Sequence, residues 1–225
     1  MHWPPAPSVA LHLACGSAAL LAGALALLAR KGGRGHRRAG RIAAVLGGIT
    51  GATAALGIAL SPVPPALAAV TLSACYQLAS SVRSLQLRGA RPGAFDALLA
   101  CAALVCVAMI ACWRGTATSS FSPAIEWSAL GFVSLVATYD LCRLVLSDEG
   151  WRRLRPLDHG LKMIGFYAGM ASAGLGNLLP FAQPWSSVVP SVAGTLGMLY
   201  VAFLRPVGRR SLGLAADDGM APRIA

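Results

Sequence analysis

Two histidines stand where the chain is about to enter apolar segments, and their side chains could bind a haem or a metal ion. His36 lies in the sequence GHRRAG and His159 in the sequence DHGLKM. Neutral imidazole is the usual axial ligand of haem and a common ligand of metals. Two helices with one histidine each would hold such a group from opposite sides, with Met163 as a nearby alternative ligand. The competing interpretation is that each imidazole only hydrogen-bonds a helix end or faces lipid headgroups, because the chain lacks CxxCH and HExxH motifs.

Polar side chains also interrupt two of the apolar segments at a depth similar to that of the histidines. They are Tyr76 with Gln77, and Tyr139 with Asp140. A charge in a membrane interior is costly unless it faces protein or water. The four residues therefore predict a polar pocket near one membrane surface. Asp140 has a second interpretation, which is a local ion pair with Arg143 one helical turn away.

One late apolar segment carries a stripe of chemically distinct side chains on a single helix face. At 100° per residue this stripe contains His159, Met163, Phe166, Met170 and Asn177. The stripe could line a cofactor or a quinone, and packing against another helix is the alternative use.

A fourth candidate ligand lies near the other membrane surface. His12 is one turn inside the first apolar segment, and Asn177 is expected at the same depth. A second polar site at the outer surface would use these two side chains with Arg114 and Glu126, and His12 would be its candidate ligand.

Seven apolar runs of 17 to 21 residues must position these side chains. As helices rising about 1.5 Å per residue, they match the roughly 30 Å hydrocarbon core of a bilayer. Helices satisfy their own backbone groups in lipid, whereas barrel strands would be about half as long and would alternate in polarity. We expect an all-α, polytopic transmembrane bundle of seven helices. The runs are Val9–Ala29, Ile42–Ser61, Ala66–Val82, Ala97–Trp113, Trp127–Ser147, Met163–Ala182 and Ser187–Leu204.

The basic residues predict how this bundle is oriented. Eighteen of the 19 Lys and Arg residues lie in or beside alternate loops and the C-terminal tail, and the intervening loops carry only Arg114. Because basic residues concentrate on the cytoplasmic side, we expect the N-terminus outside and the C-terminus in the cytoplasm of a bacterial inner membrane. The basic loops would then face anionic headgroups. The expected organisation is one membrane domain, residues 1–204, and a basic, then flexible, cytoplasmic tail, residues 205–225.

Composition argues against several other classes of protein. Only 12% of the 225 residues are charged, about half the share of a soluble domain. The net charge of +11 would suit nucleic acid, but membrane topology already accounts for 18 basic residues, so we expect no nucleic-acid partner. A nucleophile elbow, a phosphate loop and paired carboxylates are all missing, so the sequence does not favour an enzyme.

The histidine motifs resemble those of a bacterial family of uncharacterised polytopic membrane proteins, a domain of unknown function. That family has a histidine on the first helix, HR-x-x-G before the second, and H-x-x-[RK]-M opening a late helix. The resemblance covers the start and the last third of the chain, and it implies a membrane domain without an assigned activity. The matching residues are His12, His36, Arg37, Gly40, His159, Lys162 and Met163.

Three functions from different classes stay open. The first is a redox or electron-transfer protein, in which His36 and His159 hold one haem b or one metal near the cytoplasmic face. The second is a small-molecule or proton-coupled transporter. The third is an accessory or assembly protein that binds other membrane proteins through faces of small residues. The interior path of a transporter would use Gln77, Tyr139, Asp140 and Asn177.

Overall fold

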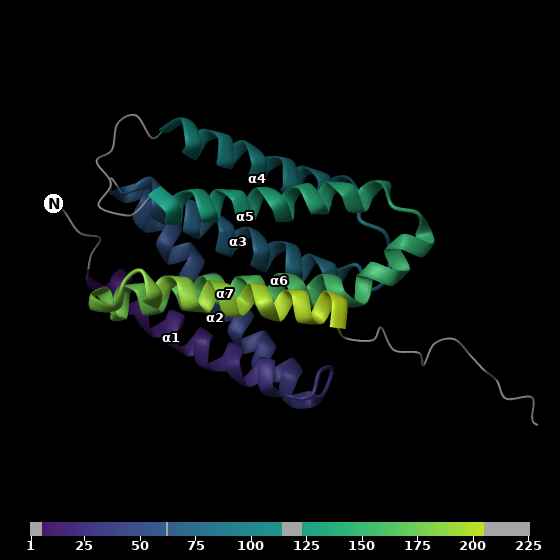
Figure 1. The fold of residues 1–225 in the computed structure, drawn as a ribbon, viewed down its shortest axis with the longest axis horizontal. Coiled ribbons are helices and arrows are strands. Elements are labelled where there is room, and N and C mark those ends of the chain that lie inside the picture. Colours follow the sequence, from purple (N-terminus) through teal and green to yellow (C-terminus); the bar gives the residue numbers. More distant parts are fainter. Residues whose placement is uncertain (1–5, 62, 114–122, 205–225) are drawn as a thin grey trace, which may run out of the picture.

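The computed structural model describes residues 6–61, 63–113 and 123–204, and it forms a bundle of seven α-helices (Figure 1). Within these residues there is no β-strand, so the predicted all-α bundle is confirmed. The expected tail, residues 205–225, lies outside the described residues, as does Arg114. The helices are α1 (Ala6–Leu28), α2 (Arg34–Leu60), α3 (Pro65–Gln86), α4 (Ala94–Trp113), α5 (Pro123–Cys142), α6 (Asp148–Leu178) and α7 (Trp185–Leu199).

Six of these helices are long and apolar enough to cross a membrane, so the chain is a multi-pass membrane protein. They are all of the helices except α6. Helix α6 has 31 residues and is about 46 Å long, but its first half is rich in charged side chains. Among the six apolar helices, α3 has the lowest mean hydropathy, 1.2. Helices α3 and α6 are therefore the polar members of the bundle.

The helix boundaries differ most from the sequence prediction at α6. The apolar run begins at Met163, but the helix begins at Asp148. Ser147 caps it by accepting a hydrogen bond from the Gly150 amide at 3.2 Å, and acidic residues fill the first turn. Hydropathy marks only the part of a helix that lies in hydrocarbon, and a helix that extends beyond the bilayer can be polar. On this exposed first turn, Arg153 lies 2.6 Å from Glu149 and lowers the pKa of that carboxyl.

Short non-α segments follow three of the helices. A 3-10 turn, Arg143–Val145, continues α5, and a second, Pro180–Ala182, follows α6. A π-helical turn, Tyr200–Leu204, continues α7. The first of these turns carries Arg143 to the buried position described below.

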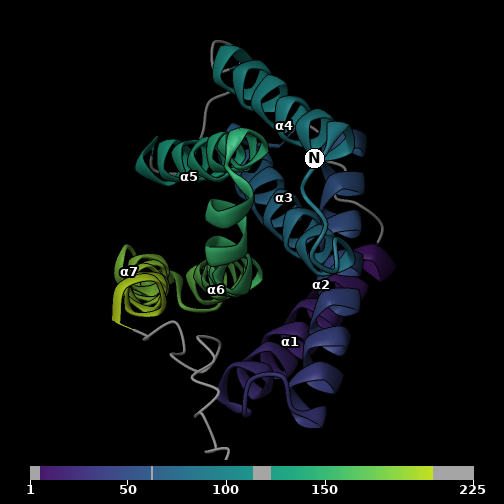
Figure 2. The same ribbon diagram turned by 90° about the vertical axis from the view of Figure 1, so that its right-hand side faces the viewer.

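Helix α3 is the centre of the bundle (Figure 2). It packs against α2, α4, α5 and α6, whereas α1 pairs mainly with α2, and α7 pairs mainly with α6. Helix α5 packs on α3 and α4, and α6 packs on α3 and α7. Helix α3 is therefore the common neighbour of α5 and α6. Small buried side chains, among them Ala100, Ala103 and Ala137, let α4, α5 and Tyr76 of α3 form a close apolar core.

The loops α1–α2, α3–α4 and α5–α6 lie at one end of the bundle, together with the end of α7 (Figure 1). We call this the basic end, because these three loops and the helix turns beside them carry most of the basic residues. The alternation of basic and non-basic loops therefore corresponds to the two ends of the folded bundle.

Candidate functional site

Four ionisable side chains are buried together near the basic end, and we call them the charge cluster. Asp140 lies on α5 and Arg143 on its 3-10 extension, while Asp158 and Lys162 lie on α6. Their exposed fractions are 2%, 1%, 1% and 4%. Charged residues are almost never buried this completely unless they are paired.

The four side chains form a closed ring in which positive and negative groups alternate. Arg143 lies 2.8 Å from Asp140 and 2.6 Å from Asp158. Lys162 lies 2.6 Å from Asp140 and 3.1 Å from Asp158. Each cation therefore contacts one carboxylate on its own helix segment and one on the other helix. The predicted local pair between Asp140 and Arg143 is present as one side of this ring.

Serine hydroxyls on α3 form hydrogen bonds with the charge cluster. The hydroxyl of Ser80 donates to Asp140 and accepts a 2.8 Å hydrogen bond from Lys162. The hydroxyl of Ser84 donates to Asp158, and it lies one turn after Ser80 on the same face. The low hydropathy of α3 thus has a structural cause, because its serines face the buried charges.

Aromatic rings border the ring of charges. Tyr76 of α3 donates a 2.7 Å hydrogen bond to Asp140. The ring of Tyr139 lies 5.7 Å from the guanidinium of Arg143 and 5.6 Å from the ammonium of Lys162, within the range of cation–π attraction. The predicted residues Tyr76, Tyr139 and Asp140 are therefore brought together at one site.

The α3–α4 loop closes the site from the basic end. Trp151 of α6 is buried against Arg143, with 5.6 Å between the guanidinium and the ring, and its indole donates a 3.1 Å hydrogen bond to the carbonyl of Ala90. Arg91 of the same loop forms a 3.2 Å ion pair with Asp148 at the start of α6. The loop and the first turns of α6 therefore cover the charge cluster.

Electrostatically the charge cluster is neutral, with two carboxylates opposite two cations. Burying an ion in a medium of low dielectric constant costs several kcal/mol, and mutual pairing must offset that cost. Neutrality explains how four charges are tolerated at one place. It also means that a gain or loss of one charge there would disturb the pairing of all four groups.

Two of the predicted pocket residues lie outside the ring. Gln77 is buried on α3, where its amide donates a 3.1 Å hydrogen bond to Ser73 and its side chain faces Gly165 of α6. Asn177 is exposed and donates a 2.8 Å hydrogen bond to Ala173 of its own helix. Fifteen residues separate it from Lys162, about 22 Å along α6. The structure therefore does not bring Asn177 to the site.

His36 and His159 share one feature that suits ligand binding. Nδ1 of His36 lies 2.9 Å from the carbonyl oxygen of Ala26, and Nδ1 of His159 lies 2.8 Å from the hydroxyl and 3.2 Å from the carbonyl oxygen of Ser81. A carbonyl partner favours the tautomer with the proton on Nδ1, which leaves the lone pair on Nε2. Both side chains are half-buried.

His12 of α1 is also held through its Nδ1 atom, in this case by oxygen atoms of α2. Its Nδ1 lies 3.1 Å from the carbonyl oxygen of Thr50 and 3.0 Å from the hydroxyl of Thr53, both on α2. Met163 is half-buried on α6, directly after Lys162. In the part of the chain that the structure describes, no group of three or more His, Cys, Asp or Glu side chains could hold a metal ion.

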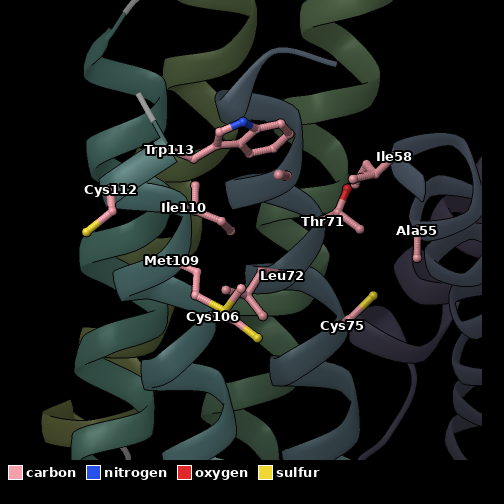
Figure 3. Close-up of a pocket in the computed structure, with 11 residues that line it drawn as sticks. Ala55, Ile58, Thr71, Leu72, Cys75, Cys106, Met109, Ile110, Cys112 and Trp113 are labelled. Carbon is pink, nitrogen blue, oxygen red and sulfur yellow. The ribbon is translucent and has the colours of Figure 1, made fainter. Parts of the chain in front are cut away.

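An apolar cavity of about 840 Å³ lies elsewhere, between α2, α3 and α4 (Figure 3). Small side chains such as Ala55 and Cys75 form its walls on α2 and α3, and Cys106 and Trp113 line it on α4. No charged side chain lines it. The cavity is therefore separate in chemistry from the charge cluster.

Sequence reasoning missed part of the site. Asp158, which is buried in α6, was not selected as a site residue, and neither were Ser80 and Ser84. Two signals were present, namely the four-residue spacing of Asp158 and Lys162, and the repeated serines of an otherwise apolar helix. Lys162 was selected only through the family resemblance.

Comparisons with protein-family models, with curated proteins and with solved structures found no match to this chain. The resemblance to a histidine-containing membrane family stays a prediction.

Proposed function

We propose that this protein is a proton-coupled transporter of a small polar molecule, and that the charge cluster is its coupling and substrate site. The observation that carries the proposal is the complete burial of Asp140, Arg143, Asp158 and Lys162 in one ring between membrane helices. Asp140 and Arg143 lie within the apolar span 123–145, and ionisable residues inside membrane segments commonly belong to substrate pathways or proton relays.

Stability alone is a poor reason to keep such a ring. A buried ion pair is often no more stabilising than apolar side chains of the same volume, because desolvation offsets the attraction. Seven groups on three helices, four charged and three hydroxyl, converge on this one place. A chain that needed only a packed helix interface would meet that need with Leu, Ala and Gly.

The ring suggests how a proton would act. A proton on either carboxylate removes one negative charge and leaves two cations sharing the remaining carboxylate. Arg143 and Lys162 would then repel each other across the ring, and the bridges between α5 and α6 would weaken. Proton uptake and the opening of the site would be coupled in this way.

We also propose that the basic end faces the cytoplasm of a bacterium, in its inner membrane. The charge partition supports this orientation. Arg34, Arg37, Arg38 and Arg41 at the start of α2 are exposed, and no acidic residue lies in the segment 30–41. Each basic side chain near an anionic bilayer surface contributes about 1 kcal/mol of attraction. Anionic lipid headgroups are therefore the expected partners of this end.

The test is solute uptake by the purified protein in liposomes. A panel of amino acids, amines and organic acids is supplied with and without an inward proton gradient, and transport currents are recorded. The gradient should drive uptake of at least one solute. Asp140→Asn should reduce that uptake about tenfold or more, since a charge-assisted hydrogen bond contributes about 1.5–3 kcal/mol. Glu149 is an exposed carboxylate on α6. Glu149→Gln is therefore the matched control and should not change uptake. A gradient that drives no solute, or equal uptake by Asp140→Asn, would reject the proposal.

A second candidate function is electron transfer through one haem b, and the histidine geometry favours it. Protein-bound histidine ligands usually hold the opposite ring nitrogen on a carbonyl or carboxylate, and His36 and His159 both do so through Nδ1. The donor set fits a haem, for which these two residues would be the ligands. The group would supply one-electron transfer when bound. A reduced-minus-oxidised visible spectrum of protein purified with its native cofactors tests this, and a spectrum without a Soret shift would reject it.

A further inference from the structure

We infer that the substrate of the charge cluster is a small zwitterion, a molecule with one carboxylate and one ammonium group. This inference rests on the proposed transport function and names the substrate class of the same site. Its basis is the way the four charges are distributed between two helices.

Each of the two helices carries its own neutral pair. Asp140 and Arg143 are three residues apart at the end of α5, and Asp158 and Lys162 are four residues apart on α6. Both spacings place the partners on one helix face, so each pair persists without the other helix. The two remaining bridges, Arg143 to Asp158 and Lys162 to Asp140, cross between the helices.

The two helices can therefore separate without leaving an unpaired charge. Breaking both crossing bridges leaves a neutral pair on each side, which avoids the large cost of an isolated ion in a membrane. The packing also allows this, because α5 is held by α3 and α4, while α6 is held by α3 and α7 (Figure 2). The crossing bridges are thus the contacts that would be exchanged when the site opens.

A ligand that replaces the crossing bridges must match both of their signs. A carboxylate would take the place of Asp158 on Arg143 or of Asp140 on Lys162, and an ammonium group would take the place of a cation on the facing carboxylate. A zwitterion does both and keeps the total charge at zero. A simple anion or cation would leave one buried charge uncompensated, so it should bind far more weakly.

The ring also has unused hydrogen-bonding capacity. Nε of Arg143 and Oδ1 of Asp158 are buried and make no hydrogen bond in the described structure. The ammonium of Lys162 is 3.1 Å from that oxygen, an ion-pair distance, but no hydrogen bond joins them. Nε of Arg143 is therefore a buried donor available to the carboxylate of a ligand, whereas Oδ1 of Asp158 is already held by its ion pair with Lys162.

Ligand binding to the full chain in detergent tests the inference through thermal unfolding. The zwitterions are glycine, alanine and γ-aminobutyrate, and the half-ligands are acetate and methylammonium, all at equal ionic strength. Concentrations up to about 10 mM detect dissociation constants into the millimolar range. At least one zwitterion should raise the melting temperature, and neither half-ligand should do so alone.

Two variants provide the matched comparison. Asp140→Asn combined with Lys162→Met removes one crossing bridge and both pairs within a helix, and it leaves Arg143 and Asp158 as a neutral pair. It should weaken zwitterion binding about tenfold or more, since charge-assisted hydrogen bonds are lost. Glu149→Gln combined with Arg153→Gln removes an exposed pair from the same helix and should bind as the parent does.

Three results would overturn the inference. They are a half-ligand that binds as tightly as the zwitterions, no zwitterion that binds, and unchanged binding by the Asp140→Asn, Lys162→Met variant. None of these alone rejects transport, which fails separately if a proton gradient drives no solute in the wider uptake panel.

Discussion

Replacing Lys162 with Met should destabilise the protein strongly, although methionine is apolar and of similar length. Lys162 is 4% exposed and contacts both carboxylates of the charge cluster. Its removal leaves two carboxylates with the single cation Arg143, and so a net charge of −1 in a buried site. Removing one partner of a buried ion pair costs about 3–5 kcal/mol.

The double variant Asp140→Asn, Lys162→Met restores neutrality, with Arg143 and Asp158 as the remaining pair. An asparagine can still accept the hydrogen bond that Tyr76 donates to Asp140. The double variant should therefore be more stable than either single variant, by about 1–3 kcal/mol, the usual range of coupling between residues in one network.

The assay is unfolding by denaturing detergent in mixed micelles, followed by circular dichroism for the parent, both single variants and the double variant. Glu149→Gln serves as the control, since this exposed carboxylate should contribute little to stability. If a single variant does not fold at all, recovery of folded protein in the double variant gives the same answer. A cost below about 1 kcal/mol for Lys162→Met, or strictly additive effects, would refute the argument that the ring is electrostatically coupled.

Three other predictions concern the cover of the site, helix packing and the histidines. Trp151→Phe keeps the ring against Arg143 but removes the indole hydrogen bond, so it should cost about 1 kcal/mol; Trp151→Ala should cost about 3–5 kcal/mol, and equal costs in the detergent assay would contradict this. Gly165→Ala places a methyl group 2.2 Å from the Gln77 side chain and should cost about 1–3 kcal/mol. Gly169→Ala, with open space around it, is its control on the same helix and should be neutral or slightly stabilising. If purified protein shows a Soret band, His36→Ala and His159→Ala should each shift or abolish it, and a spectrum indifferent to both changes would exclude these ligands.

The fold was predictable because the membrane constrains it so strongly. A run of about 20 apolar residues has few alternatives to a spanning helix, and the alternation of basic loops supports the helix count independently. The prediction failed at the start of α6, where Asp148 lies 15 residues before the apolar run begins. Helices that extend beyond the bilayer follow capping and charge rules instead of hydropathy.

From the sequence, a site residue could be identified only where a charged side chain stood in an apolar segment. Asp140 was identified because a carboxylate is conspicuous in an apolar helix, and its pairing with Arg143 followed from helix geometry. Asp158 lies in a charged segment, where one more acid is unremarkable, so its burial could not be inferred locally. Ser80 and Ser84 are small and common in membrane helices. What makes them part of the site is the approach of α5 and α6, which is tertiary information.

The local pairing of charges on each helix also has a consequence for biogenesis. The chain enters the membrane from its N-terminus, so α5 with Asp140 and Arg143 is inserted before Asp158 and Lys162 have been synthesised. A charged residue at the centre of an inserting helix costs about 2.5–3.5 kcal/mol on insertion scales. Asp140 and Arg143 lie at the end of α5, where the cost is smaller. Because the two charges of each pair lie within one helical turn and neutralise each other, each pair can enter the membrane before the other helix is in place. The ring would then close as the last step, when α6 docks against α3.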